Sequence, residues 1–583
     1  MAGAGAGTRQ YPAMGQDIAA HLAFLYGRER ARELEPRLRR LLGEHAGRPG
    51  GGGRRRTPTE RDVILITYGD QVRRPGEPPL RTLAAFLEDH LEGVVSGVHL
   101  LPFFPSSSDD GFAVIDYREV DPALGAWDDV ERIGRRFDLM VDAVFNHVSA
   151  RSRWFQGFLA GEPRYRDWFI VVDGDPDLSQ VVRPRALPLL TRFDTALGPR
   201  RVWTTFSPDQ VDLDVRNPEV LLALIEVLLF YVARGAKLIR LDAIAYLWKE
   251  IGTPCIHLPR THGVVRLLRS VLDEVAAHVL LVTETNVPHL DNVSYFGDGT
   301  DEAQLVYNFA LPPLLLHALA TGDARHLSRW AASLRVPPGG ATFLNFLASH
   351  DGIGLNPVRG LLDEEEIEAL CRRALAHGGF VSDKDDGRGS RSPYELNVNY
   401  FDALSDPGAA EPLRTQIDRF LAAHAVMLSL AGVPALYFHS LFGSRGDRAG
   451  AEASGIPRRI NRQKLVLEDL ERELAHPGSL RSMVLKGLAD LLARRRASAA
   501  FHPAGGQRVL DLDPRVFALV RTSPDGRESV LCLHNLSPEW VAVRVPPGEV
   551  RIGCGAELVL GPYQVRWAGS TGEGGRPAPA GGR

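Results

Sequence analysis

Eight short apolar segments, separated by stretches with helical spacing, constrain the fold more than any other feature of this sequence. They lie at residues 62–70, 97–104, 139–147, 236–244, 278–285, 303–309, 341–351 and 433–443. Alternating strands and helices build parallel sheets, and eight such units are typical of a closed barrel. We therefore expect an α/β fold, a (β/α)8 TIM barrel.

The unequal gaps between these segments predict further parts around the barrel. Helical spacing at 16–45 is followed by "GRPGGGGRRRTPTE", which we interpret as a flexible linker with solvated arginines rather than an anion site. Short alternating strands near the end predict an antiparallel β-domain. The expected parts are an N-terminal extension (1–58), the barrel (59–499) with insertions after strand three (148–216) and strand seven (352–432), the β-domain (500–568) and a disordered tail (569–583).

Composition excludes several classes of protein. A net charge of −4 over 583 residues gives no reason to expect nucleic acid or an anionic membrane surface as partner. The four cysteines are scattered without a CxxC pair, so we expect a reducing cytoplasm, and the N-terminus shows no secretory signal. The most apolar stretch, 220–233, is too short to span a bilayer and contains Glu226, so we predict a core helix.

Polar side chains gather where the predicted strands end. In a parallel barrel the carboxyl ends of the strands share one face, which carries the chemistry. A single such residue is easily a structural cap, but four strand ends with acidic, basic and imidazole groups indicate a shared active site. The residues are Asp142, Asn146 and His147 after strand three, Arg240 and Asp242 in strand four, Glu284 after strand five, and His350 and Asp351 after strand seven.

Converging carboxylates with one arginine suit the cleavage of a glycosidic bond with retention of configuration. Asp242 suits the ionised nucleophile, because the nearby Arg240 is expected to lower its pKa. Glu284 follows an apolar run that favours the neutral acid form. A divalent-metal site is the weaker alternative, since the carboxylates lie on separate strands, and we predict neither a metal nor another cofactor.

The segments "DAVFNH", "IRLDAI", "TET" and "ASHD", in this order, resemble the four short conserved regions of the α-amylase family of glycoside hydrolases and transglycosylases. The resemblance extends from about residue 60 to the C-terminal β-domain. It implies that Asp242 is the nucleophile, Glu284 the acid/base and Asp351 the transition-state stabiliser. It also implies that His147, Arg240 and His350 bind the glucosyl unit.

Residues 101–130, "LPFFPSSSDDGFAVIDYREVDPALGAWDDV", resemble the sucrose phosphorylase branch of that family. The resemblance implies that Asp110 pairs with Arg462 to close the far end of a pocket for one glucosyl unit. "AYLWKEIGTPCIHLPRTHGV" and "SPYELNVNYFDALS" are more similar to the glucosylglycerate phosphorylases, and we assign Tyr246 and Tyr394 in them to substrate binding. Asn286 stands where the sucrose enzymes carry a histidine, which we interpret as altered acceptor or phosphate recognition rather than a neutral loop substitution.

The expected activity is that of a retaining α-glucoside phosphorylase acting on 2-O-α-glucosylglycerate and inorganic phosphate. Sucrose as donor, and simple hydrolysis by an α-glucosidase, are the alternatives; a silent sugar-binding module is disfavoured by the intact catalytic positions. Glycerate and phosphate are anions, so arginine and lysine side chains are expected to reach the acceptor site. Candidates are Arg183, Arg185 and Arg192 in the first insertion and, preferred, Lys384, Arg388 and Arg391 in the second. We expect a monomer or homodimer.

Overall fold

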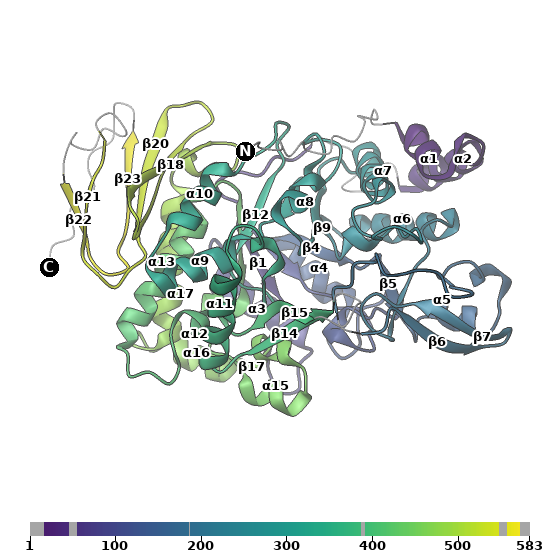
Figure 1. Cartoon of the computed structure of the whole chain (residues 1–583), viewed down its shortest axis with the longest axis horizontal. Helices are drawn as coiled ribbons and strands as arrows, with labels where there is room; N and C mark the ends of the chain where they lie inside the picture. Colours follow the sequence, from purple (N-terminus) through teal and green to yellow (C-terminus); the bar gives the residue numbers. More distant parts are fainter. Residues whose placement is uncertain (1–16, 46–54, 186, 386–390, 547–556, 572–583) are drawn as a thin grey trace.

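The computed structural model describes residues 17–45, 55–185, 187–385, 391–546 and 557–571 (Figure 1). Its centre is a closed barrel of eight parallel strands in the order β1-β16-β12-β11-β10-β9-β4-β3, with β3 pairing back to β1. All eight predicted segments contribute a strand, so the predicted TIM barrel is confirmed. The strands are β1 (Ile64–Thr67), β3 (Gly97–Leu100), β4 (Asp138–Ala143), β9 (Ala236–Leu241), β10 (Leu280–Thr283), β11 (Leu305–Tyr307), β12 (Thr342–Phe346) and β16 (Val433–Tyr437).

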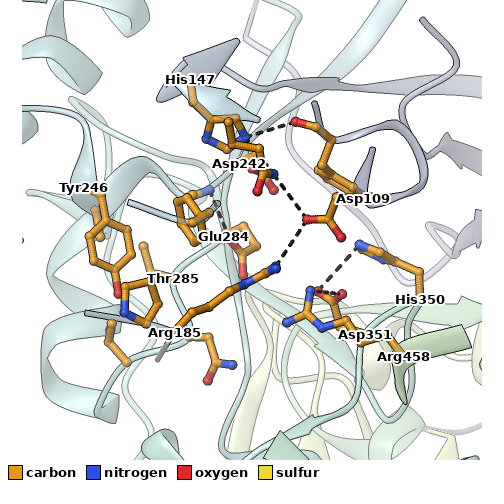
Figure 2. A pocket seen from close by; sticks show the side chains of 18 of the residues that line it. Asp109, His147, Arg185, Asp242, Tyr246, Glu284, Thr285, His350, Asp351 and Arg458 are labelled. Atoms are coloured by element: carbon orange, nitrogen blue, oxygen red, sulfur yellow. Dashed lines mark hydrogen bonds and ion pairs between the residues drawn. The ribbon is translucent and has the colours of Figure 1, made fainter. Parts of the chain in front are cut away.

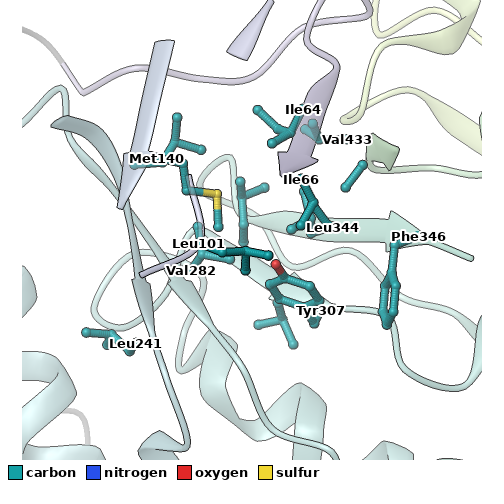
Figure 3. Packing of buried hydrophobic residues seen from close by; sticks show 14 of the residues in the cluster. Ile64, Ile66, Leu101, Met140, Leu241, Val282, Tyr307, Leu344, Phe346 and Val433 are labelled. Atoms are coloured by element: carbon teal, nitrogen blue, oxygen red, sulfur yellow. The ribbon is translucent and has the colours of Figure 1, made fainter. Parts of the chain in front are cut away.

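Apolar side chains fill the inside of the barrel and the layer between strands and helices (Figure 3). Ile66, Val282 and Leu344 are each at most 1% exposed, as strands covered on both faces require. The register between neighbouring strands also determines which polar residues meet at the carboxyl end of the barrel. Asp142 in β4 lies directly opposite Arg240 in β9, so their side chains leave the sheet on the same face.

Helices surround the barrel and cover the apolar outer faces of the strands. The apolar stretch at 220–233 forms α6, where the Asn217 side chain accepts a hydrogen bond from the Glu219 amide and Pro218 occupies the first turn. The predicted core helix is therefore present. Besides those of the two insertions, the helices between barrel strands include α3 (Pro79–Leu91), α4 (Trp127–Arg136), α6 (Pro218–Ala233), α7 (Pro259–Val275), α8 (His289–Val293), α9 (Leu311–Thr321), α10 (Arg325–Ser333) and α13 (Leu413–Ser429).

The N-terminal extension forms two helices where the sequence predicted one helical region. Gly27, with φ 84°, ends α1 (Ile18–Tyr26) and lets α2 (Arg28–His45) fold back on it. The pair lies against α7 and α6 (Figure 1). Arg37 of α2 forms a bidentate ion pair with Glu219 of α6, with N–O distances of 2.6 and 2.7 Å.

The interpretation of the linker arginines as solvated residues is wrong for the two that the structure describes. Arg55 contacts Asp273 at 2.6 Å and donates to the Thr300 carbonyl at 2.9 Å. Arg56 pairs with Asp62 and Asp138. These contacts tie the chain to the barrel before β1 begins, and Arg54 lies outside the described residues.

Both predicted insertions contain small antiparallel sheets of their own. The first contains β5 (His147–Ser149), α5 (Arg153–Leu159), β6 (Leu190–Thr195), β7 (Gly198–Trp203) and β8 (Gln210–Asp212). The second contains β13 (Ile353–Gly354), α11 (Glu364–Ala376), β14 (Phe380–Asp385), β15 (Arg391–Asn397) and α12 (Tyr400–Leu404). Its predicted end at residue 432 is too late, because α13 is a buried helix that packs on β12 and α17 and leads into β16.

After β16 the chain adds α14 (Phe438–Leu441), α15 (Arg448–Ser454), β17 (Leu465–Val466), α16 (Leu467–Leu474) and α17 (Leu480–Arg496); β17 pairs with β2 (Val72–Arg73). The C-terminal strands form a four-stranded antiparallel sheet, β18-β19-β20-β23, and a separate β21–β22 pair, at the opposite end of the molecule from α1 and α2 (Figure 1). They are β18 (Gly506–Asp513), β19 (Val516–Thr522), β20 (Glu528–Asn535), β21 (Val541–Arg544), β22 (Glu557–Leu560) and β23 (Val565–Thr571).

The C-terminal boundary requires one correction. The predicted tail starts at residue 569, but residues 569–571 pair with β20 as the end of β23. The remainder of the tail lies outside the described residues. Within the described part of the chain no helix is long and apolar enough to cross a membrane. Three cysteines, Cys255, Cys371 and Cys532, are free and buried there.

Candidate active site

One pocket at the carboxyl ends of the barrel strands collects most of the residues predicted from the sequence (Figure 2). The predicted residues that line it are His147, Arg240, Asp242, Tyr246, Glu284, Asn286, His350, Asp351 and Tyr394, with Arg185 from the first insertion. Asp142 lies beneath them, fully buried, where it contacts both His99 and Arg240. Strand ends and both insertions therefore share one cavity.

Arg240 holds the two carboxylates expected to do the chemistry. Its Nη1 donates to Asp242 Oδ1 at 2.8 Å, and its Nη2 lies 3.9 Å from Glu284 Oε2. Glu284 also accepts a hydrogen bond from the Ala243 amide at 3.1 Å. Ala243 has φ 48°, a left-handed conformation that turns the chain sharply after the strand and aims this amide at Glu284. Nucleophile and acid candidates thus share one guanidinium.

Burial dominates the ionisation of this pair of carboxyls. It raises the pKa of Asp242 to about 8, opposed by Arg240 and reinforced by the neighbouring Glu284 carboxylate. Burial likewise raises the pKa of Glu284, again opposed by Arg240. The predicted contact between Arg240 and Asp242 is present, but the prediction that it leaves Asp242 with a lowered pKa is wrong, because burial raises the pKa by more than Arg240 lowers it. The two groups titrate as a pair, and the shorter contact with Arg240 favours the charge on Asp242.

Asp351 behaves in the opposite way. Burial disfavours its charge, but the permanently charged Arg458 and Arg462 hold its pKa well below the ordinary range. Arg458 Nη1 is 2.7 Å from Asp351 Oδ1, and the same guanidinium forms a bidentate contact with the buried Glu395 at 2.6 and 3.0 Å. Asp351 is therefore a stable carboxylate, suited to stabilising positive charge that develops on a sugar ring.

Two neutral imidazoles complete the inner part of the pocket. Burial lowers the pKa of His350 to about 3 and lowers that of His147 as well, so both rings are uncharged near neutral pH. The His350 ring stacks on Phe112 with centroids 5.0 Å apart. His147 Nε2 is 3.0 Å from the Phe112 carbonyl. Neutral rings held in this way can exchange hydrogen bonds with sugar hydroxyls.

The proposed pair that closes the pocket is formed, but it faces a different cavity. Arg462 Nη1 is 2.6 Å from Asp110 Oδ2, and Arg459 joins at 2.8 Å. Asp110 and Arg462 line a neighbouring cavity with Tyr68 and Lys464. Of the two neighbouring aspartates, Asp109 and not Asp110 lines the catalytic pocket. Although burial disfavours its charge, the pKa of Asp109 is lowered to about 2, chiefly by Arg185 and Arg458.

The cationic side chain at the outer part of the pocket comes from the first insertion. Arg185 Nη2 contacts Asp109 at 3.2 Å, and its guanidinium lies 5.8 Å from the centre of the Phe206 ring. The preferred candidates of the second insertion do not line the pocket: Arg391 is exposed on β15, Lys384 donates to Asn356 at 2.8 Å, and Arg388 lies outside the described residues. Arg183 and Arg192 also do not line it.

Known proteins share this architecture and sequence. A family model described as the catalytic domain of alpha-amylase matches residues 90–331. The chain is 53% identical over 557 residues to the glucosylglycerate phosphorylase of Allomeiothermus silvanus, and the match covers 95% of this chain and 99% of that protein. The chain belongs to the α-amylase family.

Two further comparisons describe its position within the family. The chain is 34% identical to the sucrose phosphorylase of Agrobacterium vitis, over 76% of this chain and 88% of the relative. The crystal structure of sucrose 6F-phosphate phosphorylase from Thermoanaerobacter thermosaccharolyticum aligns with a TM-score of 0.71 at 27% identity, covering 86% of this chain and 98% of that one. The chain is thus more similar to the glucosylglycerate enzyme than to either sucrose enzyme.

The polar residues of this site that sequence reasoning missed include Asp109, Gln210, Glu395 and Arg458. Asp109 and Arg458 could have been found, since Asp109 directly precedes Asp110 and Arg458 lies four residues before Arg462, the pair that the resemblance implied. Gln210 and Glu395 gave no local signal. Each is polar in a β-segment of an insertion, and only the fold brings Gln210 to His147, 3.2 Å away, and Glu395 to Arg458.

Proposed function

We propose that this protein is a retaining α-glucoside phosphorylase. In the first step an Asp242 carboxylate oxygen attacks C1 of the glucosyl unit, the bond from C1 to the leaving oxygen breaks, and Glu284 gives that oxygen its proton. In the second step a phosphate oxygen attacks C1, the ester bond to Asp242 breaks, and Glu284 takes the proton back. The products are the free acceptor and α-glucose 1-phosphate.

The observation that carries this proposal is the shared contact of Asp242 and Glu284 with Arg240. The shared cation and the burial of both carboxyls support one proton held between the two groups at neutral pH, which is the state that the first step requires. Asp351 supplies a fixed negative charge opposite the sugar, as an oxocarbenium-like transition state needs.

We propose 2-O-α-glucosylglycerate as the donor, with sucrose as the alternative. The greater similarity to glucosylglycerate phosphorylase supports this order. The chemistry of the outer pocket supports an anionic acceptor, because Arg185 lies there with the amide of Asn286 and the hydroxyls of Tyr246 and Tyr394. Arg185 replaces Arg391 as the proposed anion-binding residue.

A donor screen with and without inorganic phosphate tests the proposal. Glucosylglycerate should yield glucose 1-phosphate only when phosphate is present, at a kcat/KM above that for sucrose. Release of free glucose at the same rate with and without phosphate would instead show a hydrolase. A preference for sucrose would overturn the glycerate assignment alone. The cytoplasmic location and the monomeric or dimeric state stay predictions.

A further inference from the structure

Lys249 is a buried cation that the proposed chemistry does not use. It is 3% exposed and does not line the pocket. Its ammonium group makes three contacts with oxygen, to Asp212 Oδ2 at 2.7 Å, Asn146 Oδ1 at 2.8 Å and the Tyr246 carbonyl at 2.7 Å. An ammonium group has three protons to donate, so all of its hydrogen-bonding capacity is used.

The three partners come from three separate segments of the chain. Asn146 follows barrel strand β4, Asp212 ends β8 of the first insertion, and Tyr246 belongs to the loop after β9. Lys249 therefore fastens the first insertion to the barrel at the point where the nucleophile strand ends. Removing this side chain would free the loop at Tyr246 from the other two segments, which stay joined to each other by the pairing of β5 with β8.

Each of these segments carries a residue of the pocket wall. Asn146 precedes His147, and its Nδ2 lies 3.3 Å from His147 Nδ1. Asp212 accepts from the Thr205 amide at 2.7 Å, beside Phe206. Phe206 meets Tyr246 edge to face, with centroids 5.6 Å apart.

Arg185 completes this wall, because its guanidinium faces the Phe206 ring. The part of the wall formed by Arg185, Phe206 and Tyr246 is called the acceptor wall below. Lys249 touches none of these side chains, yet its contacts determine where their backbone lies.

We propose that Lys249 is a positioning residue that sets the acceptor wall and so controls how the glucosyl-enzyme divides between phosphate and water. This inference rests on the proposed function for its reaction. A misplacement of the wall by a fraction of an ångström would weaken acceptor binding more than glucosyl transfer to Asp242, because Asp242 is held separately by Arg240.

The competing explanation is that Lys249 only neutralises Asp212. Asp212 has further donors in the Thr205 hydroxyl at 2.7 Å and Asn146 Nδ2 at 3.1 Å, so a neutral residue at this position retains partners. The double variant Lys249→Met/Asp212→Asn therefore removes the unpaired buried charge while leaving the Tyr246 loop without its tie to the other two segments. If Lys249 were only a counter-ion, Asp212→Asn would restore KM for phosphate and the product ratio in the Lys249→Met background. If Lys249 positions the wall, neither is restored.

The experiment compares wild type, Lys249→Met and the double variant, each kept well below its melting temperature. The readouts are the melting temperature, KM for phosphate, kcat/KM for the donor, and the ratio of glucose 1-phosphate to free glucose. Lys249→Met should raise KM for phosphate at least about tenfold and shift the product ratio toward free glucose. The double variant should regain the melting temperature but not the KM or the ratio.

Arg266→Met is the matched control. Arg266 is likewise buried and forms ion pairs, with Asp301 and Glu302 at 2.9 Å each, but it lies on α7 away from the pocket. It should lower the melting temperature without changing KM or the product ratio. Recovery of KM in the double variant, or an unchanged KM and ratio in both Lys249 variants, would overturn the inference.

If Lys249→Met does not fold, the double variant alone decides by its KM and product ratio. Failure of the proposed function is recognised separately, because wild type would then form no glucose 1-phosphate. The ratio of glucosyl transfer onto a second glucoside to hydrolysis would serve as the readout in that case. An unchanged ratio in the Lys249 variants would again overturn the inference.

Discussion

Arg240 contacts three carboxylates, those of Asp142, Asp242 and Glu284. A buried cation with several acidic partners keeps its own charge while only partly offsetting the cost of burying theirs. The residual cost falls on Asp242 and Glu284, where burial raises both pKa values, while Asp142 beneath them has its pKa lowered to about 2. The proposed nucleophile and the proposed acid are thus the two carboxyls whose charge the environment favours least.

Replacing Asp242 by asparagine should abolish turnover while the fold is retained. The amide is nearly isosteric but cannot form the ester with C1, and loss of a nucleophile is expected to lower kcat by at least about a thousandfold, or about 4 kcal/mol. Initial rates of glucose 1-phosphate release and a circular dichroism spectrum check this. Retention of more than roughly one tenth of wild-type activity would contradict the assignment.

The same variant should become more stable, relative to wild type, as the pH rises. Burial raises the pKa values of Asp242, to about 8, and of Glu284, so the folded pair keeps a shared proton at a pH where an unfolded aspartate, which titrates near ~4, has lost its own. Between those pH values the unfolded chain has lost the proton and the folded chain keeps it, so a rise in pH lowers the free energy of unfolding of wild type. Asparagine has no such proton to lose. The difference in melting temperature, variant minus wild type, should grow from about pH 5 to about pH 8. A constant difference would contradict the raised pKa.

Arg185 should matter for anionic ligands and Arg391 should not. Arg185→Ala removes a guanidinium from the pocket and is expected to raise KM for phosphate and for glycerate about 10-fold or more, since hydrogen bonds between charged groups contribute about 1.5–3 kcal/mol. Arg391→Ala, an exposed residue on β15, is the control and should leave both constants unchanged. Similar losses in the two variants would contradict the assignment to Arg185.

Helices α1 and α7 approach closely because α7 carries a glycine at the contact. A Cβ built on Gly263 would lie 2.9 Å from Cδ1 and Cε1 of Phe24 in α1. The neighbouring Leu22 and Leu25 are at most 4% exposed, so the interface is a packed extension of the barrel core rather than a loose attachment. The N-terminal pair is therefore part of the folded body.

Two glycine-to-alanine variants should have opposite effects on stability. Gly263→Ala gains helix propensity of about 1 kcal/mol but forces Phe24 to move, and overpacking costs about 1–3 kcal/mol, so the melting temperature should fall. Gly43→Ala in α2 meets no atom within 4 Å and should raise it. Thermal unfolding of the two variants and of wild type measures both changes in melting temperature. An increase for Gly263→Ala would show that the α1–α7 contact is not tightly packed.

At the scale of the whole molecule, the pocket is lined by segments far apart in the sequence. Asp109 follows β3, Arg185 and Phe206 belong to the first insertion, Tyr394 belongs to the second, and Arg458 follows β16. These segments converge over one end of the barrel. The Asp110–Arg462 pair lies between this pocket and the neighbouring cavity, since Arg462 also contacts Asp351 at 3.2 Å.

A pocket of this form should accept one glucosyl unit and exclude long glucans. Wild type should therefore not cleave amylose, which requires an open groove. Asp110→Ala should lose most glucosyl transfer, because it leaves the buried Arg462 without this partner beside Asp351. Reducing-end assays with amylose and donor kinetics of the variant check both parts. Efficient cleavage of amylose by wild type would refute the closed pocket.

Local pattern alone was sufficient to predict the barrel and the meeting of Asp242, Glu284 and Asp351 at one of its ends. Each strand is a short apolar run, because a strand covered on both faces must be apolar along its length. Asp242, Glu284 and Asp351 follow three such runs, and a closed parallel barrel brings all carboxyl ends of its strands to one face. Their meeting could therefore be predicted without knowledge of any loop.

Loop conformations and long-range contacts decided the rest. Asp109 and Asp110 both have left-handed backbones, with φ 53° and 46°, and that turn determines which of two identical side chains faces the catalytic pocket. Arg185 reaches the pocket and Arg391 does not, although both stand in insertions after barrel strands. The pKa of Asp242 rises because burial outweighs Arg240, and burial belongs to the assembled fold. The sequence determined which segments end in reactive groups, whereas only tertiary packing decided which side chains face each other and what it costs to charge them.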